Sequence, residues 1–317
     1  MTVDYRLLVL VDGSERTIQT VNYLKEFMPV GEKARIVLFH VLSGLPEEYR
    51  EMLQNPTCAK AEAVLKGQEL QEQRKVLETL EQAKKILIEG GFSEQSVEIK
   101  LHCRKKSVAQ DIIEEAKKGY TAVVLRRRGL GALKNMILGS VAVKMLQSLD
   151  FIPIILVGQA PPVKKILLAV DASPPSIKAV DFVGTLLGGH GYAVGIFHAI
   201  VGLGAIRFSP TEDGSQPLPE AELPESCIEA FQFKVVQLFR AVKAKLLEAG
   251  FAADQITKEV LSGVRSRPEA ILAEAEEGGY GSIVVGRRGL SRADAFFMGR
   301  VSHAVVYEGK KFTVWVV

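Results

Sequence analysis

Two glycine-containing segments of the chain have residue types and a spacing that suit the binding of a phosphate group. One has the sequence Gly286-Arg-Arg-Gly289, followed after nine residues by Gly299-Arg300. The other has the sequence Arg126-Arg-Arg-Gly129, followed after nine residues by Gly139-Ser140. Glycine lets the backbone approach a ligand closely, and the free N–H groups at a helix N-terminus attract an anion. Both segments therefore predict a phosphate-binding loop if helices begin at Gly139 and Gly299.

Neither segment is one of the two common nucleotide loops. A Walker loop ends in Gly-Lys-Ser/Thr, and the dinucleotide pattern GxGxxG is not completed after Gly129-Leu-Gly131. The sequence also has no G-x-S-x-G nucleophile motif and no evident base or metal ligand for attack on a γ-phosphate. We expect a binding protein without a catalytic residue, with at most slow ATP hydrolysis.

The remaining composition excludes several other classes of site. The three cysteines, Cys58, Cys103 and Cys227, form no CxxC pair, so a disulfide framework or a zinc site is not expected. The five histidines are not paired at metal-binding spacing, so we expect no metal held by the protein alone. A net charge of +3 and arginine clusters without interleaved aromatics do not indicate nucleic acid.

The chain is an internal duplication. Segments 6–14 and 165–173 correspond, as do Phe39-His40 and Phe197-His198, and the offset stays between 158 and 160 along the whole length. The segment 158–163 contains Pro161 and Pro162, which cannot continue a helix interior or a central strand. We expect two domains, 1–158 and 164–317, joined by a linker at about 158–163 and packed on each other as a pseudo-dimer.

Each half alternates strands and helices, which predicts a parallel sheet with helices on both faces. Ligands bind such sheets beyond the carboxyl ends of the strands, where the strand order reverses. The residues just after the first, second and fourth strands are therefore the ones to consider. Strands are expected at 7–11, 35–42, 96–102, 122–125 and 154–157, and at 166–170, 193–200, 256–261, 282–285 and 313–317. Helices are expected at about 60–90, 107–118 and 139–149, and at about 226–249, 267–277 and 299–308.

At this point the sequence resembles a known family. The loops are similar to the G-2x-G-9x-G-(S/T) motif of ATP-binding universal stress proteins, and Val11-Asp12-Gly-Ser14, Val170-Asp171-Ala-Ser173 and Phe39-His40-Val41 resemble the family's strand signatures. The resemblance covers nearly all of both halves. It implies two tandem Rossmann-like domains of the adenine nucleotide alpha hydrolase type, each with a five-stranded parallel sheet. It also implies a stress-response regulator that binds ATP, or else AMP or ADP, with Mg²⁺ accompanying a triphosphate.

The resemblance implies a role for each matching position. Asp12 and Asp171 would lie beside adenine and ribose, and the main chain at Val41 and Ala199 would contact the base. Ribose and phosphates would be held by the loop residues Gly129, Gly139, Ser140, Gly286, Gly289 and Gly299.

Both loops depart from the family motif. Arg126 replaces the first glycine of the first half, where it would fill the cleft or reach a phosphate. Arg300 replaces the final Ser/Thr of the second half, where its guanidinium could bind phosphate. Because a lost glycine threatens backbone approach itself, we favour the second half as the nucleotide site.

Several alternatives remain open at the level of sequence. Asp12 and Asp171 could simply cap turns, and His40 and His198 could pack at strand ends or line the cleft. The protein could instead be an interaction module with degenerate clefts, or an enzyme on a related fold, such as an adenylyl-transferring one. The segment 202–225, rich in Pro, Gly and acidic residues, could cover the cleft or bind a partner.

The apolar segments of the sequence indicate where in the cell the protein is expected. The apolar stretch near the N-terminus is interrupted at Asp12, and no run approaches the ~20 residues of a membrane span. We expect a cytoplasmic protein that binds neither membrane nor nucleic acid. The fifth strands are apolar edges that the two halves could cover for each other, and a further homodimer stays open.

Overall fold

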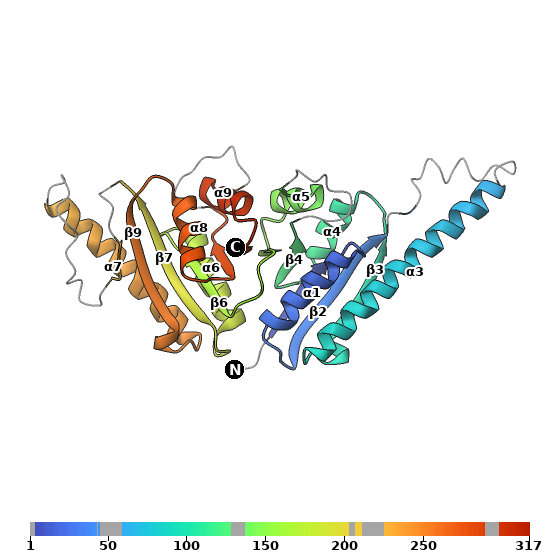
Figure 1. The fold of residues 1–317 in the computed structure, drawn as a ribbon, viewed down its shortest axis with the longest axis horizontal. Coiled ribbons are helices and arrows are strands. Elements are labelled where there is room, and N and C mark those ends of the chain that lie inside the picture. The colour runs from blue at the N-terminus through green and yellow to red at the C-terminus, as the bar shows by residue number, and fades with distance from the viewer. Residues whose placement is uncertain are drawn as a thin grey trace. The chain divides into compact units, whose positions relative to one another are not determined.

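The computed structural model describes residues 4–42, 44, 59–127, 137–202, 207–210, 225–288 and 298–317 (Figure 1). These residues form two compact units. The first unit consists of Asp4–Glu26 and Val30–Ile152, and the second unit contains Phe27–Pro29 and Pro153–Val317. Gly129, Gly289 and most of the segment 202–225 lie outside the described residues.

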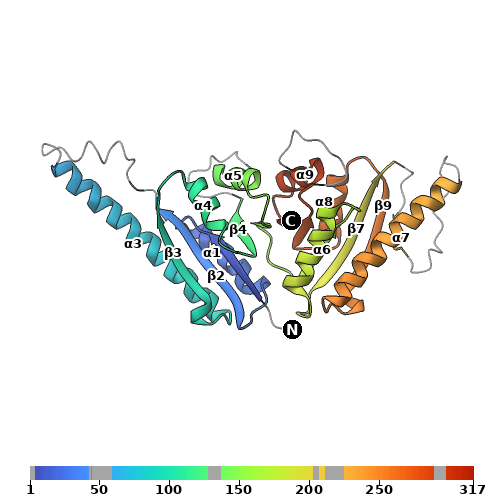
Figure 2. The same cartoon turned by 180° about the vertical axis from the view of Figure 1, so that it is seen from behind.

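The first unit contains a parallel sheet with the strand order β3-β2-β1-β4. Helix α3 packs on β2 and β3, α4 packs on β2 and α5, and α3 runs alongside β3 in both views (Figures 1 and 2). The strands are β1 (Asp4–Leu10), β2 (Lys33–Leu42), β3 (Val97–Cys103) and β4 (Ala122–Arg126). The helices are α1 (Glu15–Phe27), α3 (Ala59–Glu89), α4 (Val108–Ala116) and α5 (Ser140–Ser148), with a 3₁₀ turn, η2 (Glu94–Ser96).

The second unit repeats this arrangement in β9, β7, β6 and β10 and adds β8 next to β9, and β11 and β5 next to β10, in the order β5-β11-β10-β6-β7-β9-β8. Five neighbouring strands are parallel, whereas β5 is antiparallel to β11 and β8 is antiparallel to β9. The strands are β5 (Ile154–Val157), β6 (Lys165–Ala169), β7 (Ala193–Val201), β8 (Arg207–Phe208), β9 (Ile256–Val264), β10 (Ser282–Val285) and β11 (Thr313–Val316). The helices are α6 (Pro174–Leu187), α7 (Glu225–Glu248), α8 (Arg267–Glu277) and α9 (Arg300–Glu308), with η3 (Ala253–Gln255).

The α/β fold class expected from the sequence is confirmed, and the alternating apolar runs are its cause. Leu7, Leu8 and Val9 of β1 are fully buried, and Ile166 and Leu168 of β6 are fully buried at the equivalent places. Strands covered on both faces carry such continuous apolar sequences because neither side chain direction reaches water. Helices α5 and α9 begin directly after Gly139 and Gly299, as the loop interpretation requires.

One strand of the sheet was not predicted, and the fifth strands pair in the way that the sequence allowed. Strand β8 lies inside the segment expected to be only a long loop, where Arg207 pairs with Leu261 and Phe208 with Val260. Strand β5, the last strand of the first repeat, belongs to the second unit through its antiparallel pairing with β11. The latter arrangement covers the apolar edge of β11, which the sequence had identified as an edge that needs cover.

Candidate functional site

The first unit contains a cavity of about 540 Å³ at the carboxyl ends of β1, β2 and β4. This is the place where the strand order reverses, because β1 lies between β2 and β4. Its volume lies within the range of about 300–1,000 Å³ that is typical of small-molecule sites. Five of the predicted site residues line it together: Asp12, Val41, Arg126, Gly139 and Ser140.

The loop after β1 is organised by Asp12. Its Oδ1 atom accepts hydrogen bonds from the backbone N–H of Ser14 at 3.1 Å, from the Ser14 hydroxyl at 2.6 Å and from the Thr17 hydroxyl at 3.3 Å. Gly13 has a φ of +72°, and a Cβ there would lie 2.9 Å from Val76 Cγ2. Asp12 therefore caps the turn and also faces the cavity, so the two interpretations of this residue are compatible.

The end of β2 supplies His40 and the main chain of Val41. The His40 Nδ1–H donates to the Val11 carbonyl oxygen at 2.8 Å, which ties the ends of β1 and β2 together. Both residues line the cavity, and the Val41 side chain is buried. His40 thus combines the strand-end packing role with a place on the cavity wall.

The loop after β4 closes on itself before α5 begins. The Gly139 N–H donates to the Arg127 carbonyl oxygen at 2.7 Å, and Gly139 is the N-cap residue of α5. The N-cap has no side-chain hydrogen bond to the first turn, because glycine carries no side chain. The first turn of α5, with Ser140 exposed, therefore directs its partial positive charge toward the cavity.

The cavity wall carries more positive than negative side chains. Its cations are Arg16, Lys75, Arg126 and Arg127, and its carboxylates are Asp12 and Glu72. Burial lowers the pKa of Arg126, the neighbouring Arg16 lowers it further, and Asp12 opposes the shift. Burial also lowers the pKa of Arg127 to about 10. Guanidinium groups held close together and partly desolvated favour an anionic ligand.

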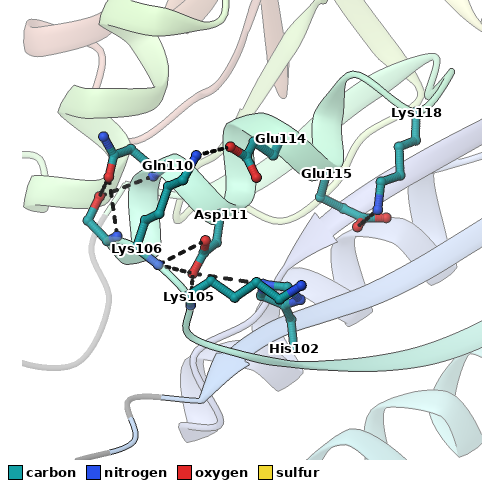
Figure 3. Close-up of polar contacts among 9 residues, drawn as sticks. His102, Lys105, Lys106, Gln110, Asp111, Glu114, Glu115 and Lys118 are labelled. Carbon is teal, nitrogen blue, oxygen red and sulfur yellow. Dashed lines mark hydrogen bonds and ion pairs between the residues drawn. The ribbon is translucent and has the colours of Figure 1, made fainter. Parts of the chain in front are cut away.

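Helix α4 contributes an apolar part of the cavity wall, through Val108 and Ile112. The start of α4 is fixed by a capping box, in which Ser107 and Gln110 exchange hydrogen bonds (Figure 3). The buried Asp111 carboxylate also accepts hydrogen bonds from the backbone N–H groups of Lys105 and Lys106, at 2.9 and 3.3 Å. Val108, the first residue of the helix, is thereby held in place.

The second unit repeats the first two loops closely. Asp171 Oδ1 accepts hydrogen bonds from the backbone N–H of Ser173 at 3.1 Å and from the Ser173 hydroxyl. The His198 Nδ1–H donates to the Val170 carbonyl oxygen at 2.6 Å. Burial lowers the pKa of His198, and Arg267 contributes to the lowering. The predicted residues Asp171, Ala199, Gly286, Gly299 and Arg300 occupy places equivalent to those of the first unit.

Two residues distinguish the second unit from the first. The Arg267 Nε–H donates to the Ala199 carbonyl oxygen at 3.3 Å, at the place that corresponds to Val41. A Cβ on Gly286 would lie 2.8 Å from the backbone of Pro175 and Ser176, so this glycine is required by the close start of α6. In the first unit β4 continues through Arg126, whose side chain lines the cavity without closing it.

The sequence missed several residues of the cavity wall, namely Arg16, Lys75 and Val108. Arg16 follows the signature Val11-Asp12-Gly-Ser14 by two residues, which is the available signal, whereas Lys75 and Val108 come from helices that no motif marks. Among the described residues, no three His, Cys, Asp or Glu side chains gather as a metal site would require. The Cys103 thiol is free and exposed.

This geometry defines a tandem pair of doubly wound, Rossmann-like α/β domains with a cavity at the switch point of the first. The universal stress protein family matches residues 5–157 and again residues 162–317, and the chain belongs to this family. Within the described residues, no helix combines the length and the apolar character that crossing a membrane demands.

Individual relatives agree with this assignment. A universal stress protein of Mycolicibacterium smegmatis is 26% identical over 227 residues, which cover 70% of this chain and 73% of the relative. The crystal structure of a universal stress protein from Archaeoglobus fulgidus has a TM-score of 0.63 at 18% identity and covers 98% of this chain and 97% of its own. A putative universal stress protein from Pseudomonas aeruginosa has a TM-score of 0.51 at 16% identity, with 99% and 93% covered. These structural likenesses concern the fold.

Proposed function

We propose that the protein is a regulator of the stress response that binds an adenine nucleotide, ATP or else AMP or ADP, in the cavity of the first unit. The observation that carries this proposal is the convergence of Asp12, Val41, Gly139 and Ser140 on one cavity of about 540 Å³. These residues come from three separate loops. A cavity with an apolar wall and a few convergent polar groups is the usual form of a small-molecule site.

The proposed orientation of the nucleotide follows from the chemistry of the walls. The base would lie against Val108 and the main chain of Val41, and the ribose beside Asp12. The phosphates would lie at the N-terminus of α5, where Ser140 adds a hydroxyl donor and Arg126 a cation. Mg²⁺ would accompany a triphosphate as part of the ligand.

This proposal changes the preference of the sequence analysis, which favoured the second unit because it keeps the first glycine. The close contact of Gly286 with Pro175 and Ser176 gives that glycine a packing role that is independent of any ligand. Arg126, in turn, lines a cavity that remains open. The preference for the second unit is not tested by the described residues, since Gly289 lies outside them, but these observations support the first unit.

We propose that turnover is slow and that the nucleotide acts by changing conformation or association. The support is the environment of Asp12, whose Oδ1 atom accepts three hydrogen bonds within its own turn. A carboxylate occupied in this way is poorly placed to accept a proton from an attacking water. A cytoplasmic location and a homodimer remain proposals that rest on the sequence.

Isothermal titration of the full chain with ATP, AMP and adenosine tests the proposal. We expect binding of ATP, and a ligand at 100 times its dissociation constant should raise the free energy of unfolding by about 2.7 kcal/mol. The absence of both a heat signal and a thermal shift at millimolar nucleotide would contradict nucleotide binding and would favour the alternative of a protein-interaction module.

A charge variant locates the phosphates. Ser140→Asp places a carboxylate at the first turn of α5, where it suits the helix dipole but repels phosphate. We expect weaker binding of ATP with little change for adenosine. Arg300→Asp makes the equivalent change at the start of α9 and should leave ATP binding unchanged. Loss of binding only in Arg300→Asp would show that the second unit holds the nucleotide.

A further inference from the structure

Helices α4 and α8 begin in the same way but present different first residues. Ser107 caps α4, and its hydroxyl accepts a hydrogen bond from the Gln110 N–H at 3.3 Å. Ser266 caps α8, and its hydroxyl accepts a hydrogen bond from the Glu269 N–H at 3.4 Å. The residue after each cap is Val108 in the first unit and Arg267 in the second. The two positions are therefore equivalent by local structure as well as by sequence offset.

The two side chains do different things at the carboxyl end of the second strand of each unit. Val108 lines the cavity together with Val41 and leaves it open. Arg267 extends to the equivalent strand, where its Nε–H donates to the Ala199 carbonyl oxygen at 3.3 Å. Burial lowers the pKa of His198 on the same strand, and the charge of Arg267 contributes to the lowering.

We propose that Arg267 is a specificity-determining residue that excludes the adenine base from the cleft of the second unit, so that each chain binds one nucleotide, in the first unit. This inference rests on the proposed function. A base that contacts the main chain at Ala199 would have to displace the guanidinium from a carbonyl oxygen. The side chain of Ala199 is buried. If the Arg267 N–H is displaced, the ligand has to supply a new hydrogen-bond donor to the Ala199 carbonyl oxygen.

The difference in side-chain chemistry strengthens this exclusion. Valine gives a flat apolar surface that suits one face of an aromatic ring, and it loses little entropy because its side chain is stiff. Arginine brings a long cationic side chain to the equivalent position of the chain, and holding it aside for a ligand restricts several rotatable bonds. The two halves therefore differ in the residue that meets the base as well as in the glycine loops.

Exchange of the two residues tests the inference on the full chain. The number of ATP molecules bound per chain is measured by isothermal titration and equilibrium dialysis. We expect one for the natural protein and two for Arg267→Val, because the valine recreates the wall of the first unit. In Val108→Arg we expect affinity at the first unit to fall by about tenfold or more, which corresponds to about 1.4 kcal/mol.

A control and the contrary outcomes separate this inference from the proposed function. Arg265→Val removes an exposed arginine two residues away and should still bind one ATP. Circular dichroism and the fluorescence of Trp315 verify that each variant is folded. A natural protein that binds no nucleotide contradicts the proposed function. A natural protein that binds one nucleotide, with Arg267→Val also binding one, overturns the role of Arg267 alone. A natural protein that binds two, or loss of all binding in Arg267→Val, overturns it as well, since the arginine would then hold the base rather than exclude it.

Discussion

Arg207 on β8 donates a hydrogen bond of 2.8 Å to the carboxylate of Glu274 on α8. The same guanidinium lies 3.2 Å from Glu277 and 3.5 Å from Glu259 on β9. The side chain of Glu274 is only 9% exposed, and that of Glu259 is 26% exposed. One arginine of a two-residue edge strand thus compensates three carboxylates, two of which are largely removed from water.

In the first unit a different residue provides the cation that pairs with the buried carboxylate. There Lys100 on β3, at the place of Glu259, forms an ion pair of 2.7 Å with Glu115 on α4, which corresponds to Glu274. Because the charge on the third strand is reversed in the second unit, two carboxylates meet where the first unit has an ion pair. Strand β8 supplies the cation that β9 does not carry at this position, and this ion pairing favours the pairing of β8 with β9.

Replacing Arg207 by alanine should destabilise the second unit. Removal of the shared cation leaves buried carboxylates without their strongest partner, and we expect the free energy of unfolding to fall by about 1–3 kcal/mol. Urea unfolding followed by the fluorescence of Trp315, the single tryptophan of the chain and a fully buried residue of the second unit, measures this change.

Two further variants control the Arg207 experiment. Lys245→Ala removes an exposed ion pair with Asp181 and should change stability by less than about 0.5 kcal/mol. Glu259→Lys, combined with Arg207→Ala, recreates the arrangement of Lys100 and Glu115 and should restore most of the loss. Equal losses in Arg207→Ala and in the double variant would contradict the explanation.

The stability of the first unit should depend on pH through Glu115. Burial alone would raise the pKa of this carboxyl, but hydrogen bonds from Lys100, Tyr120 and Lys118 outweigh it and lower the pKa from 4.5 to about 2. A depressed pKa contributes stability that is present above pH 4.5 and is lost as the pH falls toward 2. We expect Lys100→Met to be less stable than the natural protein at pH 7. The difference in the free energy of unfolding between the two proteins should become smaller below pH 4.5.

Hydrogen exchange at the amides of β3 measures this difference in stability, whereas the fluorescence of Trp315 reports on the second unit. Exchange is measured on both proteins between pH 3 and pH 7 and is corrected for the intrinsic exchange rate. Lys106→Met serves as a matched control, because its ion pair with Glu114 is more than half exposed on both sides. A difference of constant size across the pH range would show that Lys100 acts by packing and not by charge.

Glu259 should have the opposite dependence on pH. Burial raises the pKa of this carboxyl, Arg207 partly offsets the shift, and Glu274 adds to it. A raised carboxyl pKa means that ionisation is less favourable in the folded protein, so stability is lost as the pH rises through the folded pKa. Glu259→Gln, which mimics the protonated form, should therefore be more stable than the natural protein at pH 7 and equal to it at low pH. A Gln variant that is less stable at pH 7 would mean that the pairing with Arg207 dominates.

Much of the fold could be predicted because its signals are local. The continuous apolar sequences mark strands buried on both faces, and the glycines before Ser140 and Arg300 mark helix starts that need no side-chain cap. The residues Asp12, Val41 and Gly139 could be assigned to one site because the carboxyl ends of parallel strands meet at one edge of a sheet.

The remaining features depend on side chains that reach across the fold. The contact of Arg267 with Ala199 joins residues 68 positions apart, and that of Arg207 with Glu274 joins residues 67 positions apart. No spacing rule marks such pairs. The two-residue strand β8 is too short for an alternating pattern, and Lys75 reaches the cavity from the middle of a long helix whose rotation the sequence does not fix.

A substitution at Gly286 tests whether this glycine, in the loop after β10, is needed for packing or for ligand binding. A Cβ at this position would lie 2.8 Å from the backbone atoms of Pro175 and Ser176, and backbone atoms cannot shift as cheaply as the end of a flexible side chain. We therefore expect Gly286→Ala to lower the free energy of unfolding by about 1–3 kcal/mol, as other overpacked sites do, and urea unfolding followed by Trp315 measures it.

Two comparisons decide whether this account of Gly286 is right. Gly67→Ala, in helix α3 with no atom within 4 Å of the added Cβ, should leave the protein as stable or slightly more stable, because alanine favours a helix by about 1 kcal/mol over glycine. Arg126→Ala, at the equivalent place in the first unit, should leave stability nearly unchanged and weaken ATP binding. If Gly286→Ala instead keeps full stability and abolishes ATP binding, the glycine serves the ligand, and the second unit is the nucleotide site after all.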